Sequence, residues 1–153
     1  MRLDRAWILD HIPHQGSMCL LDEVMEWDAT SVRCRSTSHR DLDHPLRREG
    51  KLGIACGIEY AAQAMAVHGA LTAISTGAAT TAAPAAGFLA ALRGVRLHAL
   101  RLDDIAGDLL CIAVRAAGDG TTALYEFELR SAATCLLSGR ATVVLDTSKR
   151  LQP

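Results

Sequence analysis

The apolar positions of the chain are grouped in one long uncharged stretch near its middle. This stretch runs from residue 52 to residue 92 and contains a single formally charged side chain, Glu59. Within it, residues 57–74 begin with a glycine and are rich in alanine, which predicts a helix about 27 Å long. The small residues of 75–87, with Pro84 among them, predict a loop that ends this helix. A helix with so little charge needs cover around most of its circumference.

Most of the remaining chain carries the patterns of strands, either alternating apolar and polar residues or a short apolar run. Gly118, Asp119 and Gly120 form a turn signal between two such segments, which predicts a hairpin. The predicted strands are 31–38, 88–100, 109–116, 122–130 and 134–145, and 18–27 fits either a buried strand or a short helix. Residues 1–11 are predicted as a short helix or turn, and the charged residues 39–51 as a loop.

This order of elements predicts an α+β fold in which a long helix is wrapped by an antiparallel sheet. No internal repeat or linker divides the chain, so we expect a single domain over residues 1–153. One helix covers one face of a sheet, and a monomer would leave much apolar surface exposed. We therefore expect a dimer in which the sheet continues across two chains.

Composition and charge exclude several classes of function. The 153 residues include 16 Lys and Arg and 17 Asp and Glu, and only 4% are aromatic, which is unlike a nucleic-acid-binding protein. The five cysteines show no metal-site spacing, so neither a disulfide framework nor a bound metal is expected. The chain begins without the apolar core of a signal peptide, and its uncharged stretch is too rich in small and polar residues to span a membrane. We expect a cytoplasmic protein.

Glu59 is the first candidate for a functional side chain. It lies in the first turn of the predicted helix, in an otherwise apolar stretch. There it either complements the positive end of the helix dipole or, with a neutral carboxyl, acts as a general acid. Burial raises the pKa of a carboxyl and the helix dipole lowers it, so the sequence alone does not fix the direction of the shift. Gln63 is one turn further along the same face, so its amide can reach the carboxyl and orient it, whereas Gln63 taken alone fits a polar residue on an exposed stripe.

Among the six histidines, His39 and His44 are the best placed to meet Glu59. Both lie in the loop before the predicted helix, where they can reach Glu59 or its copy across a dimer interface. His14 follows a proline and is predicted to pack a turn, while His68 is on the opposite side of the helix and is predicted to lie in the core. His11 and His98 are predicted to lie on the surface.

Three segments resemble bacterial 3-hydroxyacyl-acyl carrier protein dehydratases, which have the hotdog fold. The sequence IPHQGSMCLLDEV at 12–24 resembles their opening strand, and GIEYAAQAMAVHGAL at 57–71 resembles their central helix with its Glu-x-x-x-Gln pair. Residues 87–116 resemble the strand, linker and strand that follow. The chain lacks the Gly-His-Phe-Pro and Met-Pro-Gly motifs that precede the helix in this family. In that respect it is similar to the divergent branch found beside type II polyketide genes for aryl polyene pigments.

The resemblance assigns roles to residues around the start of the helix. In these enzymes a loop histidine removes a proton from C2, and the helix carboxyl of the other subunit protonates the departing C3 hydroxyl. Carried over to this chain, Glu59 is the acid, Gln63 orients it, and the N–H of Gly57 polarises the thioester carbonyl. The histidine is either His44, fifteen residues ahead of Glu59, or His39, twenty residues ahead.

The function implied by the resemblance is dehydration of 3-hydroxyacyl thioesters, in fatty acid biosynthesis or in polyketide biosynthesis of the aryl polyene type. The substrate is then carried on the phosphopantetheine of acyl carrier protein, and no metal or redox cofactor is implied. Two alternatives stay open: an acyl thioesterase in which Glu59 activates water or attacks the thioester, and a non-catalytic hotdog subunit of a heteromeric dehydratase. The expected partners are acyl carrier protein and a second hotdog subunit, in a homodimer or a heterodimer.

Several basic residues form either a docking site for the acidic carrier protein or ordinary charged surface. They are Arg47, Arg48, Lys51, Arg93, Arg96 and Arg101.

Overall fold

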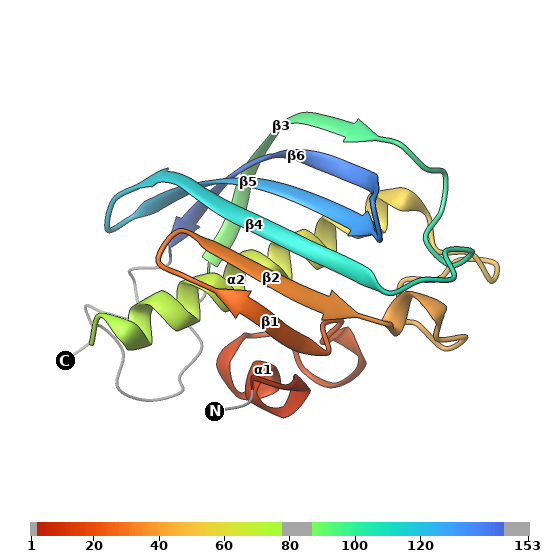
Figure 1. The fold of residues 1–153 in the computed structure, drawn as a ribbon, viewed down its shortest axis with the longest axis horizontal. Coiled ribbons are helices and arrows are strands. Elements are labelled where there is room, and N and C mark those ends of the chain that lie inside the picture. Colours follow the sequence, from red (N-terminus) through yellow and green to blue (C-terminus); the bar gives the residue numbers. More distant parts are fainter. Residues whose placement is uncertain (1–2, 78–86, 146–153) are drawn as a thin grey trace.

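The computed structural model describes residues 3–77 and 87–145, so most of the loop predicted at 75–87 lies outside the described residues. A six-stranded antiparallel sheet curves around one long helix (Figure 1). The helices are α1 (Arg5–His11) and α2 (Gly57–Ser75), with 3-10 turns at Gly16–Met18, Ser38–Arg40 and Ile54–Cys56. The strands are β1 (Glu23–Trp27), β2 (Ser31–Ser36), β3 (Gly87–Leu97), β4 (Leu109–Gly118), β5 (Thr122–Ser131) and β6 (Thr134–Leu145).

The strand order in the sheet is β1-β2-β4-β5-β6-β3, and every neighbouring pair is antiparallel. β3 follows α2 in the chain but pairs with the last strand, so β1 and β3 are the two edges of the sheet. The hairpin predicted at Gly118-Asp119-Gly120 joins β4 to β5, where the Asp119 N–H donates to the Thr122 carbonyl at 2.9 Å. The architecture confirms the predicted α+β class, with a long helix wrapped by an antiparallel sheet.

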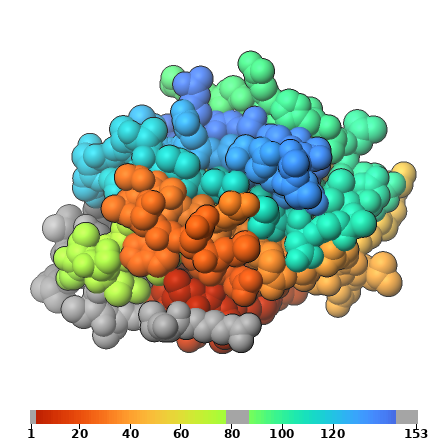
Figure 2. All heavy atoms as spheres, viewed as in Figure 1, coloured from red at the N-terminus to blue at the C-terminus, as the bar shows by residue number. Residues whose placement is uncertain are grey.

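The helix α2 is buried on most of its sides, as its lack of charge predicted. Its buried residues are Gly57, Tyr60, Ala61, Gln63, Ala64, Met65, Val67, His68 and Leu71. The sheet covers one side, and α1 with the segment that follows it contributes fully buried residues such as Ile8 and Ile12 to the same core. Figure 2 shows this N-terminal segment directly below the first two strands. None of the helices in the described ranges is both long and apolar enough to cross a lipid bilayer.

The segment 18–27, which fitted either a strand or a short helix, divides into three parts. It begins at the end of a 3-10 turn at Gly16–Met18, continues as a buried extended stretch, and becomes β1 only at Glu23. The extended stretch contains Cys19, Leu20 and Leu21, each at most 2% exposed. Because its backbone is not part of the sheet, its N–H and C=O groups are available to side chains of α2 and of the loop after β2.

Candidate active site

The residues that the sequence singled out at the start of α2 form a hydrogen-bonded cluster. Glu59 lies in the first turn of the helix, and its side chain is 33% exposed. Nε2 of Gln63 donates to Oε1 of Glu59 at 3.1 Å, as the helical spacing predicted. On the other side, Nε2 of His14 lies 2.9 Å from the same oxygen. Within the described ranges no hydrogen bond engages Oε2, so this oxygen is the one available to a ligand.

Gln63 is fully buried and fixes the direction of the Glu59 carboxylate. Its Nε2 also donates to the carbonyl of Met18 at 2.8 Å, and its Oε1 accepts from the N–H of Leu20 at 2.9 Å. These two backbone contacts leave only one orientation of the amide, because the donor and the acceptor are not interchangeable. The extended stretch before β1 therefore fixes the orientation of the Gln63 amide, and this amide fixes the orientation of the Glu59 carboxylate.

The contact with His14 determines the charge of Glu59. The hydrogen bond from His14 lowers the pKa of the Glu59 carboxyl below its usual value, and this effect exceeds the opposing effect of burial. Glu59 is therefore a carboxylate at neutral pH, with His14 donating from Nε2. Nδ1 of His14 is buried and has no hydrogen-bond partner among the residues that the structure describes.

His44 lies away from Glu59, in a second buried hydrogen-bond network. Its ring is 5% exposed; Nδ1 accepts from the N–H of Leu46 at 3.0 Å, and Nε2 donates to the Tyr60 hydroxyl, also at 3.0 Å. The Tyr60 hydroxyl in turn lies 2.7 Å from Oγ of Ser38, and this Oγ donates to the Leu20 carbonyl. Both ring nitrogens are occupied, and burial lowers the pKa of His44. The ring is neutral and anchors the loop before α2.

His39 is fully buried, and its Nε2 donates to the carbonyl of Ile105 at 2.9 Å. Burial lowers its pKa as well. The structure thus brings neither His39 nor His44 to Glu59 within the chain, and each ring has a structural role. His14, predicted to pack a turn, is the histidine that meets Glu59; that prediction was wrong. It lies between α1 and the turn at Gly16–Met18, where packing of α1 on α2 brings it to the start of the helix.

Comparisons with known proteins identify the family of the chain. The family model of the ApeP-like proteins, described as ApeP dehydratase, matches residues 7–152. The chain belongs to the ApeP-like dehydratase family. Its assignment as a dehydratase of the divergent, aryl polyene type is thereby confirmed, as the sequence resemblance implied. No curated protein shows a significant match to the chain.

Solved structures confirm the hotdog fold for this ApeP-like dehydratase. A chain of the dehydratase heterocomplex ApeI:P from Xenorhabdus doucetiae is 25% identical, with a TM-score of 0.81 over 94% of this chain and 93% of that one. A thioesterase from Haemophilus influenzae is 10% identical, with a TM-score of 0.55 over 80% of this chain and 76% of that one. The PaaI protein of the E. coli phenylacetic acid degradation operon is 11% identical, with a TM-score of 0.57 over 80% and 78%. The last two likenesses show the fold alone.

Gly57 of this ApeP-like dehydratase has a packing role. A Cβ atom there would lie 2.7 Å from Cδ2 of Leu137 and 2.9 Å from Cδ2 of Leu129, so only glycine lets the start of α2 pack this closely on β5 and β6. Its N–H donates to the carbonyls of Ile54 and Ala55, because the 3-10 turn at Ile54–Cys56 runs directly into the helix. The geometry therefore does not offer this N–H to a thioester carbonyl.

The basic residues that fitted either a docking site or ordinary charged surface separate into two groups. Arg47 and Arg101 lie beside the buried carboxylate of Asp103, which also accepts the N–H of Leu52 at 2.8 Å. The hydrogen bond from Arg101 holds the pKa of the Asp103 carboxyl well below its usual value. Through Asp103, these two arginines help to hold the loop before α2 in place. The second group is Arg48, Lys51, Arg93 and Arg96. Among the described residues, none of these four side chains forms an ion pair within 4.0 Å.

Proposed function

We propose that this dehydratase acts on 3-hydroxyacyl thioesters carried by acyl carrier protein, and that Glu59 is its acid–base residue. The observation that supports this is the state of the Glu59 carboxylate. One oxygen is held by His14 and Gln63, while the side chain remains 33% exposed and its second oxygen has no partner among the described residues. A fixed carboxylate with one free oxygen is suited to proton transfer with a bound substrate.

The charge of Glu59 suggests the direction of the first proton transfer. Dehydration removes a proton from C2 and hydroxide from C3, which together make one water. A carboxylate that takes the C2 proton becomes a carboxylic acid, and it can then give this proton to the departing C3 hydroxyl, so the reaction balances without a second donor. This cycle differs from the sequence-based expectation, in which Glu59 starts protonated and His39 or His44 takes the C2 proton.

The surroundings of Glu59 assist both steps of this cycle. His14 and Gln63 stabilise the carboxylate and keep its free oxygen in one direction. The positive end of α2 is close to the reacting atoms and favours the negative charge that develops on the thioester oxygen when C2 loses its proton. The reaction is a pair of proton transfers, so the proposal includes no metal or redox cofactor. The substrate is held through the phosphopantetheine arm of the carrier protein.

A second hotdog subunit is the proposed protein partner, because β3 leaves the sheet open at one edge. Large apolar side chains of β3 are exposed there, with Phe88 at 59% and Leu97 at 51%. A strand from another subunit placed antiparallel to β3 would satisfy its backbone groups and cover these side chains. The solved relative is itself a heterocomplex, which supports a heteromer for this chain.

The proposal is tested by mass spectrometry of a 3-hydroxyacyl-acyl carrier protein incubated with the chain, alone and with a purified ApeI-type hotdog subunit. Loss of one water from the carrier-bound acyl group is the expected product. Glu59→Gln is expected to slow this loss by at least about 100-fold. His14→Ala is expected to slow it less, because His14 acts through Glu59. His98→Ala changes an exposed histidine and is the matched control.

Each other outcome of this experiment would correct the proposal in a defined way. Release of free acid would show a thioesterase. Full activity of Glu59→Gln, with loss of activity in His44→Ala or His39→Ala, would show that a loop histidine, and not Glu59, transfers the proton. Activity that depends on the second subunit and is unchanged by Glu59→Gln would identify this chain as a non-catalytic subunit.

A further inference from the structure

The edge strand β3 has two chemically different halves. The first half of β3 is apolar, and its Phe88, Leu89 and Leu92 are between 37% and 59% exposed. The second half contains Arg93 and Arg96, both exposed. Gly94 lies between them with φ of 60°, at a bulge in the pairing of β3 with β6. An exposed edge strand of eleven residues is long enough to bind another strand.

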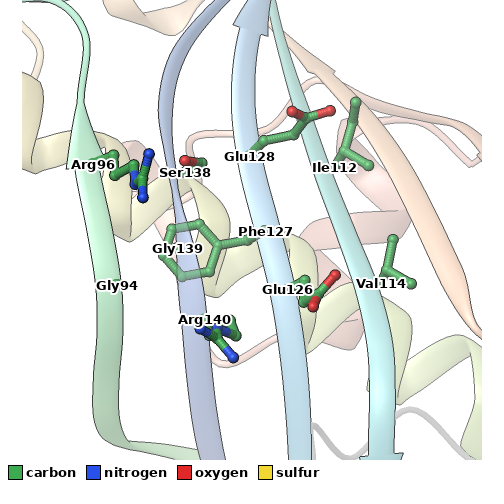
Figure 3. Close-up of a pocket in the computed structure, with 10 residues that line it drawn as sticks. All are labelled: Gly94, Arg96, Ile112, Val114, Glu126, Phe127, Glu128, Ser138, Gly139 and Arg140. Carbon is green, nitrogen blue, oxygen red and sulfur yellow. The ribbon is translucent and has the colours of Figure 1, made fainter.

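A third arginine joins the basic half from the neighbouring strand. Arg140 of β6 is registered directly opposite Arg93, and Ser138 is opposite Arg96. Directly opposed residues point to the same face of a sheet, so Arg93 and Arg140 share one face, and like charges in this arrangement repel. A hollow of about 370 Å³ on this part of the sheet is lined by Arg96 and Arg140, and also by Glu126 and Glu128. Figure 3 shows the two arginines at one side of it, on the face of the sheet away from α2.

Among the described residues, no carboxylate forms an ion pair with these three arginines. No Asp or Glu occurs in the sequence between Glu59 and Asp103, so β3 carries none. In the part of the chain that the structure describes, none of the three arginines has a carboxylate oxygen within 4.0 Å. Glu126 of β5 is registered opposite Arg140 without reaching this distance, and Glu128 pairs with Arg130 at 3.3 Å.

We propose that β3 selects its partner by charge. The strand that binds it is antiparallel, belongs to a different hotdog subunit, carries carboxylates opposite Arg93 and Arg96, and carries apolar residues opposite Phe88 and Leu92. This inference rests on the subunit pairing of the proposed function and specifies its partner. Charge complementarity of this kind chooses among partners and suppresses wrong ones.

Pairing with a second copy is disfavoured by the same residues. In an antiparallel pair of identical strands centred between Gly94 and Val95, Arg93 of each copy faces Arg96 of the other. If the two β3 strands pair about the centre of their apolar halves, none of the arginines faces an opposite charge, because β3 contains no carboxylate in either copy. No register of self-pairing gives Arg93 or Arg96 a carboxylate from β3, and charged residues on an edge strand are a common device against self-association.

A charge-reversed copy of the chain provides a probe with the required carboxylates. We would mix the full chain with the double variant Arg93→Glu/Arg96→Glu, and measure mass by light scattering and native mass spectrometry at low and high salt. The mixture is expected to form a one-to-one dimer with a Kd at least about tenfold lower than that of either chain alone, and this difference is expected to shrink as salt is raised. The double variant Arg48→Glu/Lys51→Glu, which makes the same change in charge on the loop before α2, is the control and is expected not to form this dimer.

Two outcomes would overturn the inference: a mixture that associates no more tightly than the separate chains, or an unmodified chain that forms a salt-insensitive dimer by itself. Either result leaves the dehydration assay of the proposed function unaffected. Failure of that assay, in turn, does not alter the association of the two chains, so the two proposals fail separately.

Discussion

Nε2 of His14 lies 2.9 Å from Oε1 of Glu59, and this contact joins the segment after α1 to the first turn of α2. It is the main reason that the carboxyl has a lowered pKa although it is half-buried in an apolar neighbourhood. The second support of the carboxylate, Gln63, is fixed by the backbone of Met18 and Leu20. The N-terminal third of the chain therefore determines the chemistry of a residue on the central helix.

Removal of His14 is expected to raise the pKa of Glu59. In His14→Ala the largest cause of the lowered pKa is lost, while the opposing effect of burial remains. NMR titration of the glutamate side-chain carboxyl measures this shift directly. Gln63→Ala is expected to raise the pKa less, because the Gln63 hydrogen bond is the smaller of the two. An unchanged pKa in His14→Ala would contradict the structure.

The same pair has a consequence for stability. A carboxyl whose pKa is lower in the folded state stabilises the protein above its unfolded pKa, and this contribution is lost as pH falls through the folded value. The native chain is therefore expected to exceed His14→Ala in unfolding free energy at neutral pH. The gap between them is expected to close in acid, below the folded pKa of Glu59. Urea titrations at several pH values measure both quantities.

Substitution of two glycines of α2 by alanine is expected to change the stability of the protein in opposite directions. Gly57→Ala places a methyl group within 3 Å of Leu129 and Leu137, both fully buried, and is expected to cost about 1–3 kcal/mol. Gly69→Ala meets nothing within 4 Å and is expected to add about 0.5–1 kcal/mol through better helix propensity. Thermal unfolding of the two variants beside the native chain checks this. A stabilised Gly57→Ala would show that the side chains around it can move aside.

The Tyr60 hydroxyl is expected to matter for stability because it connects His44 to Ser38. Tyr60→Phe leaves the buried N–H of His44 without its acceptor, at a cost of about 1–3 kcal/mol. In the double variant Tyr60→Phe/His44→Leu the loss is expected to be smaller than the sum of the single losses, since the two residues share one hydrogen bond. Denaturant unfolding of the four proteins in this cycle gives the coupling. Additive losses would show that the hydrogen bond does not contribute.

Buried histidines are expected to make the fold sensitive to mild acid. Burial lowers the pKa values of His39, His44 and His68 below the usual 6.5, so the unfolded chain binds their protons more readily than the folded one. Stability is therefore present above about pH 6.5 and falls as pH drops towards the folded values. Urea unfolding between about pH 7.5 and about pH 5 measures the slope. His68→Gln is expected to reduce this slope, and His98→Gln, which changes an exposed ring, is expected to leave it unchanged.

Local patterns in the sequence were sufficient to predict most elements of this fold, although they left residues 18–27 open between a strand and a helix. The helix predicted at 57–74 is α2 at Gly57–Ser75, and the strand predicted at 134–145 is β6 with the same bounds. The Gly-Asp-Gly turn was also predicted correctly, because turn residues, apolar alternation and helix composition act over a few neighbouring positions. The contact of Gln63 with Glu59 belongs to the same class, since helical spacing alone places the two side chains one turn apart.

Tertiary structure decided which histidine meets Glu59. His44 and His39 are closer to Glu59 in the sequence, but the loop before α2 folds inwards and uses their rings to bind Tyr60 and the Ile105 carbonyl. His14 is brought to Glu59 only by the packing of α1 on α2, and no local pattern encodes that packing. The sequence by itself determined the long helix, the strands other than β1, and the candidate carboxyl group, Glu59. The ionisation of that carboxylate and its histidine partner depend on contacts between distant segments, because burial and hydrogen bonding exist only once the chain has folded.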